Sequence, residues 1–153
     1  MPDSQIYLAL KTLTNAQIKT LPTTPVEIIP ALGPNNAAIP IAWNFSLNNV
    51  AGAYGNVANA VWQLFVSGAT GALTAVRPVA GILLTPGVYP RGVSGSESYV
   101  GAGTFEGSVI TDTGNTAADT AIVLSDLWNV TDYTLGHDDN TLKISVFYVI
   151  ADV

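Results

Sequence analysis

The chain has 153 residues, a formal net charge of −6 and no cysteine. This length fits a single domain spanning residues 1–153, and the lack of thiols excludes a disulfide framework and thiolate metal sites. Only 10% of the residues are charged, against roughly 25% in an ordinary soluble domain. A surface so poor in charge predicts that neighbouring subunits cover part of it, as in a building block of an assembly.

Charge and hydropathy also argue against two classes of partner. The cationic residues are scattered along the chain rather than clustered, so nucleic-acid binding is not expected. The longest apolar runs have the length of one strand, far below the roughly 20 residues of a membrane span, and the first residues show no export signal. We therefore expect a soluble protein made in the cytoplasm, with no nucleic-acid or membrane partner.

The first predicted element is a strand over residues 5–11. Ile6, Leu8 and Leu10 share one parity, and the residues between them are mixed in character. Such a period of two is typical of a strand with one face in a core. The side chains of Ile6, Leu8 and Leu10 are expected to point into that core.

A short helical turn is predicted next. Thr14 and Gln17 have the spacing of a capping box, in which the Thr hydroxyl accepts from the backbone N–H three residues on and the Gln side chain reaches back. Ile18 and Leu21 would share the buried face, and Pro22 would end the helix.

Residues 21–40 contain five prolines and predict an extended, stiff crossing or edge strand. The clearest strand of the chain follows over residues 39–48. One parity of this strand is apolar and is expected to face the core; it holds Ile39, Ile41, Trp43, Phe45 and Leu47.

Five shorter β-like runs are bounded by Gly, Pro, Asn or Asp; they cover residues 26–29, 61–66, 81–85, 104–110 and 121–124. Together with the strands near both ends and around residues 39–48, they give about eight short strands. The predicted fold class is all-β. We expect a two-sheet antiparallel sandwich, a jelly roll or related Greek key, with one short N-terminal helical turn.

The last strand has two apolar faces near its end. Its core parity holds Leu142, Ile144, Val146, Tyr148 and Ile150. The other parity begins polar and turns apolar at Phe147 and Val149, so either another part of the chain or a neighbouring subunit must cover it. The low charge of the chain favours a subunit, and we predict that Phe147 and Val149 lie in an interface.

The sequence offers little for catalysis. It has one histidine, His137, and no nucleophile elbow, P-loop or HExxH motif, so an enzyme is not predicted, and no catalytic, cofactor or metal residue is assigned. The polar loop 132–140 could offer Ca²⁺ oxygen ligands from Asp132, Asp138, Asp139 and Asn140, but EF-hand spacing is missing. We favour a solvated hairpin loop whose side chains bond their own backbone.

Aromatic residues suggest one alternative. A sugar-stacking platform, as in lectin-like sandwiches, could be built from Trp43, Trp62, Trp128, Tyr54, Tyr89 and Tyr99. Trp43 lies on the apolar parity of its strand, however, which favours packing in the core or between subunits.

Two segments carry a family resemblance. Residues 13–30, LTNAQIKTLPTTPVEIIP, and residues 140–153, NTLKISVFYVIADV, resemble the two ends of small proteins from the structural gene clusters of tailed bacteriophages. These segments make up about a fifth of the chain. The resemblance implies a virion component without a catalytic motif. Among such components, a capsid cement or decoration protein suits a compact sandwich of this size.

Two functions from different classes are therefore considered. The first is a structural virion protein on the capsid surface, made in the host cytoplasm, with Phe147 and Val149 in an oligomer or capsid interface. Its partners would be the major capsid protein and itself, and symmetry favours a homotrimer on local threefold axes, with a dimer next. The alternative is a tail-associated or receptor-binding sandwich that recognises glycan. Neither function calls for a cofactor.

Overall fold

The computed structural model describes residues 5–67, 77–78, 83, 87–89, 101–102, 119–126 and 129–152. Antiparallel strands make up most of this part of the chain, and one short helix, α1 (Asn15–Thr20), lies near its N-terminus. The all-β antiparallel sandwich with a short N-terminal helical turn is thus confirmed. Its assignment as a jelly roll or Greek key stays a prediction.

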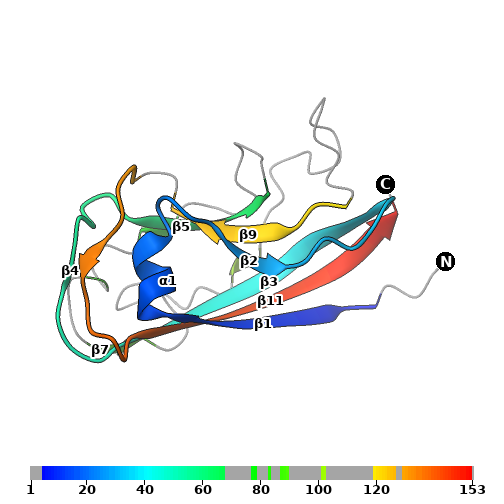
Figure 1. Ribbon diagram of the computed structural model, residues 1–153. Helices are drawn as coiled ribbons and strands as arrows, with labels where there is room; N and C mark the ends of the chain where they lie inside the picture. The colour runs from blue at the N-terminus through cyan, green and yellow to red at the C-terminus, as the bar shows by residue number, and fades with distance from the viewer. Residues whose placement is uncertain are drawn as a thin grey trace.

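In the described part of the chain, the larger sheet has five strands. β1 (Tyr7–Thr14) pairs with β11 (Thr141–Asp152), and β11 pairs with β3 (Asn36–Asn49). Two short strands, β7 (Gly87–Tyr89) and β8 (Gly101–Ala102), also pair with β3. All four pairings are antiparallel. β11 lies between β3 and β1, and β1 is the outermost strand on its side of the sheet (Figure 1).

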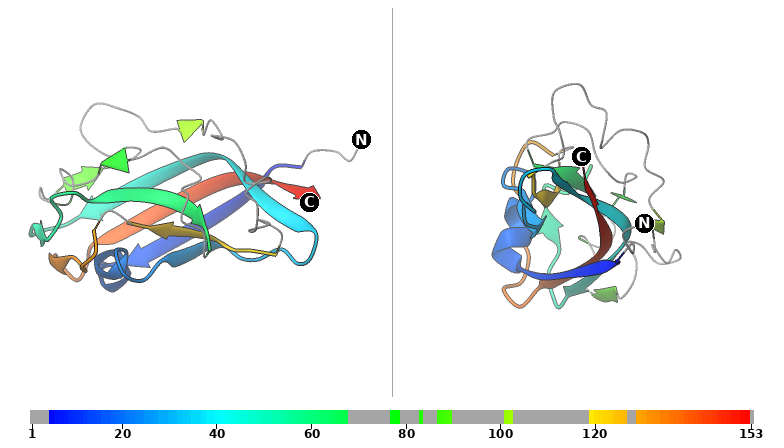
Figure 2. Two further views of the ribbon diagram at one scale, coloured as in Figure 1. Left: turned by 90° about the horizontal axis from the view of Figure 1, so that it is seen from above. Right: turned by 90° about the vertical axis from the view of Figure 1, so that its right-hand side faces the viewer.

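A second antiparallel sheet lies across from the first (Figure 2). Its strands, in spatial order, are β2 (Val26–Ile29), β9 (Ile122–Ser125), β5 (Val61–Val66) and β6 (Arg77–Pro78). Within the described strands β2 is an edge strand, which agrees with the prediction for segment 21–40, but residues 36–40 of that segment begin β3, which lies inside the strand order of the larger sheet. A separate ladder joins β4 (Tyr54–Gly55) to β10 (Thr134–Leu135).

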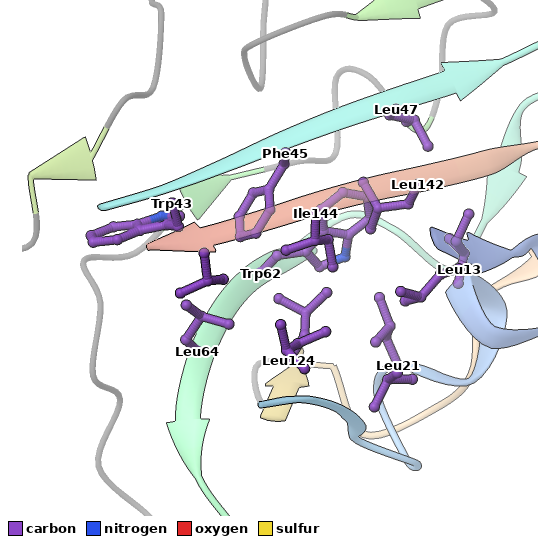
Figure 3. Packing of buried hydrophobic residues seen from close by; sticks show 14 of the residues in the cluster. Leu13, Leu21, Trp43, Phe45, Leu47, Trp62, Leu64, Leu124, Leu142 and Ile144 are labelled. Carbon is purple, nitrogen blue, oxygen red and sulfur yellow. The ribbon is translucent and has the colours of Figure 1, made fainter. Parts of the chain in front are cut away.

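One hydrophobic cluster fills the space between the two sheets (Figure 3). Phe45 on β3 meets Trp62 on β5 edge to face, with ring centroids 6.1 Å apart. Leu142, Ile144 and Val146 of β11 are at most 1% exposed. The first half of the predicted core row in β11 is therefore confirmed, because alternate residues of a strand point to the same face.

Helix α1 links β1 of one sheet to β2 of the other. The predicted capping box is present: the Gln17 backbone N–H donates to Thr14 Oγ1 at 3.4 Å, and the Thr14 backbone N–H donates to Gln17 Oε1 at 3.1 Å. Ile18 and Leu21 are completely buried. The apolar side of this single helical turn therefore packs into the same core as the sheets.

Sequence periodicity located the middle strands well. The predicted runs 26–29 and 61–66 coincide with β2 and β5, and the run 121–124 falls one residue before β9. The run 104–110 lies outside the described residues. So does the run 81–85 apart from Leu83, whose side chain is fully buried.

The alternation of β3 breaks at Ile41, which corrects the predicted core row there. The register between β3 and β11 shifts between Phe147 and Tyr148, and the shift leaves Ile41 without a partner on β11. Such a bulge reverses which parity faces the core. Ile39 and Ile41 are therefore only half-buried, whereas the rest of the predicted row is buried.

The predicted orientation of the N-terminal strand is wrong. Ile6, Leu8 and Leu10 are 59%, 49% and 71% exposed. The reason is the register with β11, in which Ala9 and Leu13 lie opposite the inward-facing residues of that strand. Residues directly opposite in a ladder share a face, so Ala9 and Leu13 lie on the core side of β1 and the even-numbered residues face outward; Lys11 shares the parity of Ala9 and Leu13 but is exposed.

The end of β11 also departs from the predicted core row. Tyr148 is half-buried and Ile150 is 38% exposed. β11 has 12 residues, whereas β9 in the facing sheet has 4, and the C-terminal end of β11 extends past β9 (Figure 1). Tyr148 instead stacks on Tyr7 of the neighbouring strand, with ring centroids 5.4 Å apart.

Candidate interaction surface

Phe147 and Val149 lie on the outer face of the larger sheet. They follow the fully buried Val146 and alternate with the residues that face the core. Phe147 is 42% exposed and Val149 is half-buried. Their position on the outside is what an interface requires, and the contact itself stays a prediction.

Strand register brings further apolar side chains to this place. Leu8 on β1 lies directly opposite Phe147, and Ile39 on β3 lies opposite Val149. Leu10 shares the outward parity of Leu8. Because register partners share a face of a sheet, these five residues gather on one side. We call them the outer apolar face: Leu8, Leu10, Ile39, Phe147 and Val149.

The outer apolar face has a polar border along the same strands. Ser145 of β11 lies opposite Asn44, and Lys143 lies opposite Ser46. The outward side of the sheet thus changes from apolar to polar along β11, from Phe147 toward Lys143. No member of the outer apolar face carries a charge, so a partner bound there would be held by burial of apolar surface, with little dependence on salt.

The sequence predicted two of the five residues of this surface. Phe147 and Val149 stood out because they interrupt a polar parity, but Leu8, Leu10 and Ile39 were assigned to the core. One signal could have corrected Leu8 and Leu10: Leu13 belongs to the opposite parity and is completely buried. An alternation extended through Leu13 would have turned Leu8 and Leu10 outward.

Loop 132–140 does not present its polar groups together. Asn140 is completely buried. Its Oδ1 accepts the Val50 backbone N–H at 2.8 Å, and its Nδ2 lies 3.1 Å from Asn49 Oδ1 and 3.0 Å from the Tyr54 hydroxyl. Tyr54 in turn donates to Asn15 Oδ1 at 2.7 Å. Asn140 therefore ties the loop to the end of β3 and to β4 rather than facing solvent.

The remaining polar residues of that loop point elsewhere. His137 and Asp139 are exposed and contact each other, with the Asp139 backbone N–H donating to His137 Nδ1 at 3.2 Å. Asp132 accepts from the Thr23 hydroxyl, and Asp138 is exposed. Across the described ranges, no three His, Asp or Glu side chains form a group that could hold a metal ion.

A second buried polar cluster surrounds Tyr133. Its hydroxyl donates to Asp126 Oδ2 at 2.5 Å and accepts from Trp62 Nε1 at 3.2 Å. Burial first, and then the bond to Asp126, raise the pKa of Tyr133 well above its usual range. Tyr133 therefore stays a hydrogen-bond donor, and the cluster fixes the start of the 132–140 loop against β5.

Three members of the possible sugar platform belong to the core. Trp43, Trp62 and Tyr54 are at most 2% exposed, so their rings cannot stack on a sugar. Trp128, Tyr99 and the side chain of Tyr89 lie outside the described residues.

Comparisons with known proteins add no relative. No family model, curated protein or solved structure matches the chain. Within the described residues, no helix has the length and apolar character needed to cross a membrane. Function must therefore be argued from the surface of this chain and from the resemblance of its two end segments.

Proposed function

We propose that the protein is a structural virion protein of a tailed bacteriophage, of the capsid cement or decoration type. In this role it binds the lattice of the major capsid protein, works as a homo-oligomer on the capsid surface and stabilises the head. The observation that carries the proposal is the outer apolar face, which gathers exposed side chains in a chain with only 10% charged residues.

The mechanical setting of that face suits a cement protein. Phe147 lies on β11, which is paired on both sides, with β1 and with β3. The β1–β11 ladder joins eight residue pairs, from Tyr7 with Tyr148 to Thr14 with Thr141. A contact made through Phe147 would thus be supported on the β1 side by an unbroken ladder, while the ladder with β3 has its bulge between Phe147 and Tyr148.

The chemistry of the face also suits permanent attachment. Moving a large apolar side chain from water into a packed contact contributes about 1.5–3 kcal/mol when burial is complete. Several such residues acting together on each subunit, repeated over a lattice, give durable binding without disulfides. The alternative, a tail-associated or glycan-recognising module, has less support because Trp43, Trp62 and Tyr54 are buried.

A binding experiment separates the two functions. Labelled protein is mixed with empty capsid shells of the phage and, separately, with host cells. A cement protein binds shells and leaves cells unlabelled, and Phe147→Ser weakens shell binding at least about tenfold. The matched control is Val130→Ser, which changes an 87% exposed valine in the loop between β9 and β10. Binding to cells alone would refute the proposal and support the receptor-binding alternative.

A further inference from the structure

β1 ends the larger sheet on one side. Among the described strands only β11 pairs with it, and Figure 1 shows β1 beside β11, on the side away from β3. The other edge of an outermost strand presents backbone N–H and C=O groups in the spacing that another strand requires. The occupant that fits such an edge best is therefore an extended strand.

The usual protection of a free edge is sparse in β1. Proteins commonly guard edge strands with charged side chains, Lys above all, with inward-pointing charges, with proline or with a bulge. Lys11 is the only charged residue of β1, no proline interrupts it, and its register with β11 runs without a shift from Tyr7 to Thr14. Leu8 and Leu10, at 49% and 71% exposure, line the same strand.

We propose that this edge pairs with β1 of a second copy, antiparallel and about a twofold axis perpendicular to the sheet. A strand paired antiparallel with its own copy gives a closed, self-complementary contact. Residues 5–14 contain no acidic side chain, so the net charge of −6 does not concentrate repulsion at the junction. The contact is separate from capsid binding and concerns the free protein.

The exposed side chains select one register. Pairing must keep the even-numbered residues of both copies on the same face, because a slip of one residue would oppose outward to inward side chains. Centring the twofold axis on Leu8 places Leu8 opposite Leu8 of the second copy. Ile6 then lies opposite the second copy's Leu10, and Lys11 lies opposite its Gln5. All three exposed apolar residues gain apolar partners, and the two Lys11 side chains stay apart.

This register also joins the two outer apolar faces. Leu8 lies beside Phe147 within one copy, so the pairing makes a row that runs from Phe147 of one copy through both Leu8 residues to the Phe147 of the other. The combined sheet would join the five described strands of each copy and have one continuous outer side. The dimer is therefore the expected form of the free protein, rather than the trimer that lattice symmetry favours.

Cysteine cross-linking tests the register directly, because the chain has no cysteine of its own. Residues directly opposite in an antiparallel ladder lie about 4.5–5.5 Å apart at Cα, which is within the range a disulfide spans. Leu8→Cys should therefore give a disulfide-linked dimer on mild oxidation. Leu10→Cys is the matched control, since its two copies would lie four residues apart along the strand, or about 13 Å, and should stay unlinked.

Sedimentation equilibrium of the full chain supplies the second measurement. We expect a monomer–dimer equilibrium that Leu8→Lys weakens at least about tenfold, because it opposes two like charges, while Val130→Lys leaves it unchanged. Circular dichroism checks that each variant is folded. A monomeric wild-type protein, a trimer, a dimer that tolerates Leu8→Lys, or equal cross-linking of both cysteine variants would overturn the pairing. A monomer that still binds capsid shells would overturn the pairing and leave the proposed function standing.

Discussion

Leu8 of β1 and Phe147 of β11 lie directly opposite each other in an antiparallel ladder. Leu8 is 49% exposed and Phe147 is 42% exposed. Two large apolar side chains that contact each other usually do so on the buried side of a sheet. Here the buried side of the same ladder is already filled, because Ala9 lies opposite the completely buried Val146. The pair therefore places apolar surface on the outside of the sheet as well, and the proposed interface rests on this surface.

Two substitutions in β11 should separate folding from association. Phe147→Ser removes an outward side chain and should lower the free energy of unfolding by no more than about 1 kcal/mol. Ile144→Ala, three residues away and 1% exposed, opens a cavity in the core and should cost about 2–5 kcal/mol. Urea unfolding followed by circular dichroism measures both. Equal losses would mean that the chain itself covers Phe147.

Asn140 should be the most sensitive residue of its loop. Asn140→Ala leaves the Val50 backbone N–H and the Asn49 side chain with one fewer partner in a buried place, and each buried polar group left unsatisfied costs about 1–3 kcal/mol. We expect a loss of at least about 2 kcal/mol in urea unfolding. Asp138→Ala, at an exposed neighbouring position, is the control and should change stability by less than about 0.5 kcal/mol.

Chelation should leave the protein unchanged. The side-chain amide of Asn140 is engaged in internal hydrogen bonds, and Asp138 and Asp139 are exposed. The loop therefore does not bring together the oxygen ligands that Ca²⁺ requires. Melting curves with EDTA and with added Ca²⁺ should coincide. A melting temperature that falls with EDTA and recovers with Ca²⁺, but not in Asp138→Ala, would show a metal site in this loop.

Local patterns predicted the elements of this fold better than their orientation. The capping box of Thr14 and Gln17 needs only neighbouring residues, and it forms as expected. The outward turn of Leu8 depends on pairing with β11, more than 130 residues away in the chain. With Tyr7 and Ala9 on the other parity, the local sequence gave two nearly equal apolar faces, and only tertiary packing decided between them.

The outer apolar face and the loop 132–140 show the same limit of prediction from local sequence. Phe147 and Val149 could be singled out from the sequence because the alternate residues of the same strand already formed an apolar row directed to the core. The bulge at Ile41 was missed, although Pro40 beside it is a signal, because a proline within a strand that is not at the edge of a sheet usually lies at a bulge. The buried position of Asn140 was also missed, because the partners of its side chain are Asn49 of β3, the adjoining Val50 and Tyr54 of β4 rather than groups of its own loop.

Alkaline pH should destabilise the fold through Tyr133. Its pKa is raised above the ordinary value of 10.0, chiefly by burial and then by the bond to Asp126, and the pKa of Tyr54 is raised by burial as well. The unfolded chain therefore releases these protons first. The stabilisation is complete below about pH 10 and falls as the pH rises further.

The slope of stability against pH isolates this effect. Each tyrosine that stays protonated only in the folded state lowers the free energy of unfolding by up to about 1.4 kcal/mol per pH unit above pH 10. Tyr133→Phe lowers the free energy of unfolding at neutral pH, because the bond to Asp126 is lost. Between about pH 9 and pH 11, however, the free energy of unfolding of this variant should fall less steeply than that of the wild type, and the fall that remains is due to Tyr54. Urea unfolding across this range measures both slopes. Parallel declines in wild type and variant would show that Tyr133 ionises as readily in the folded protein as in the unfolded chain.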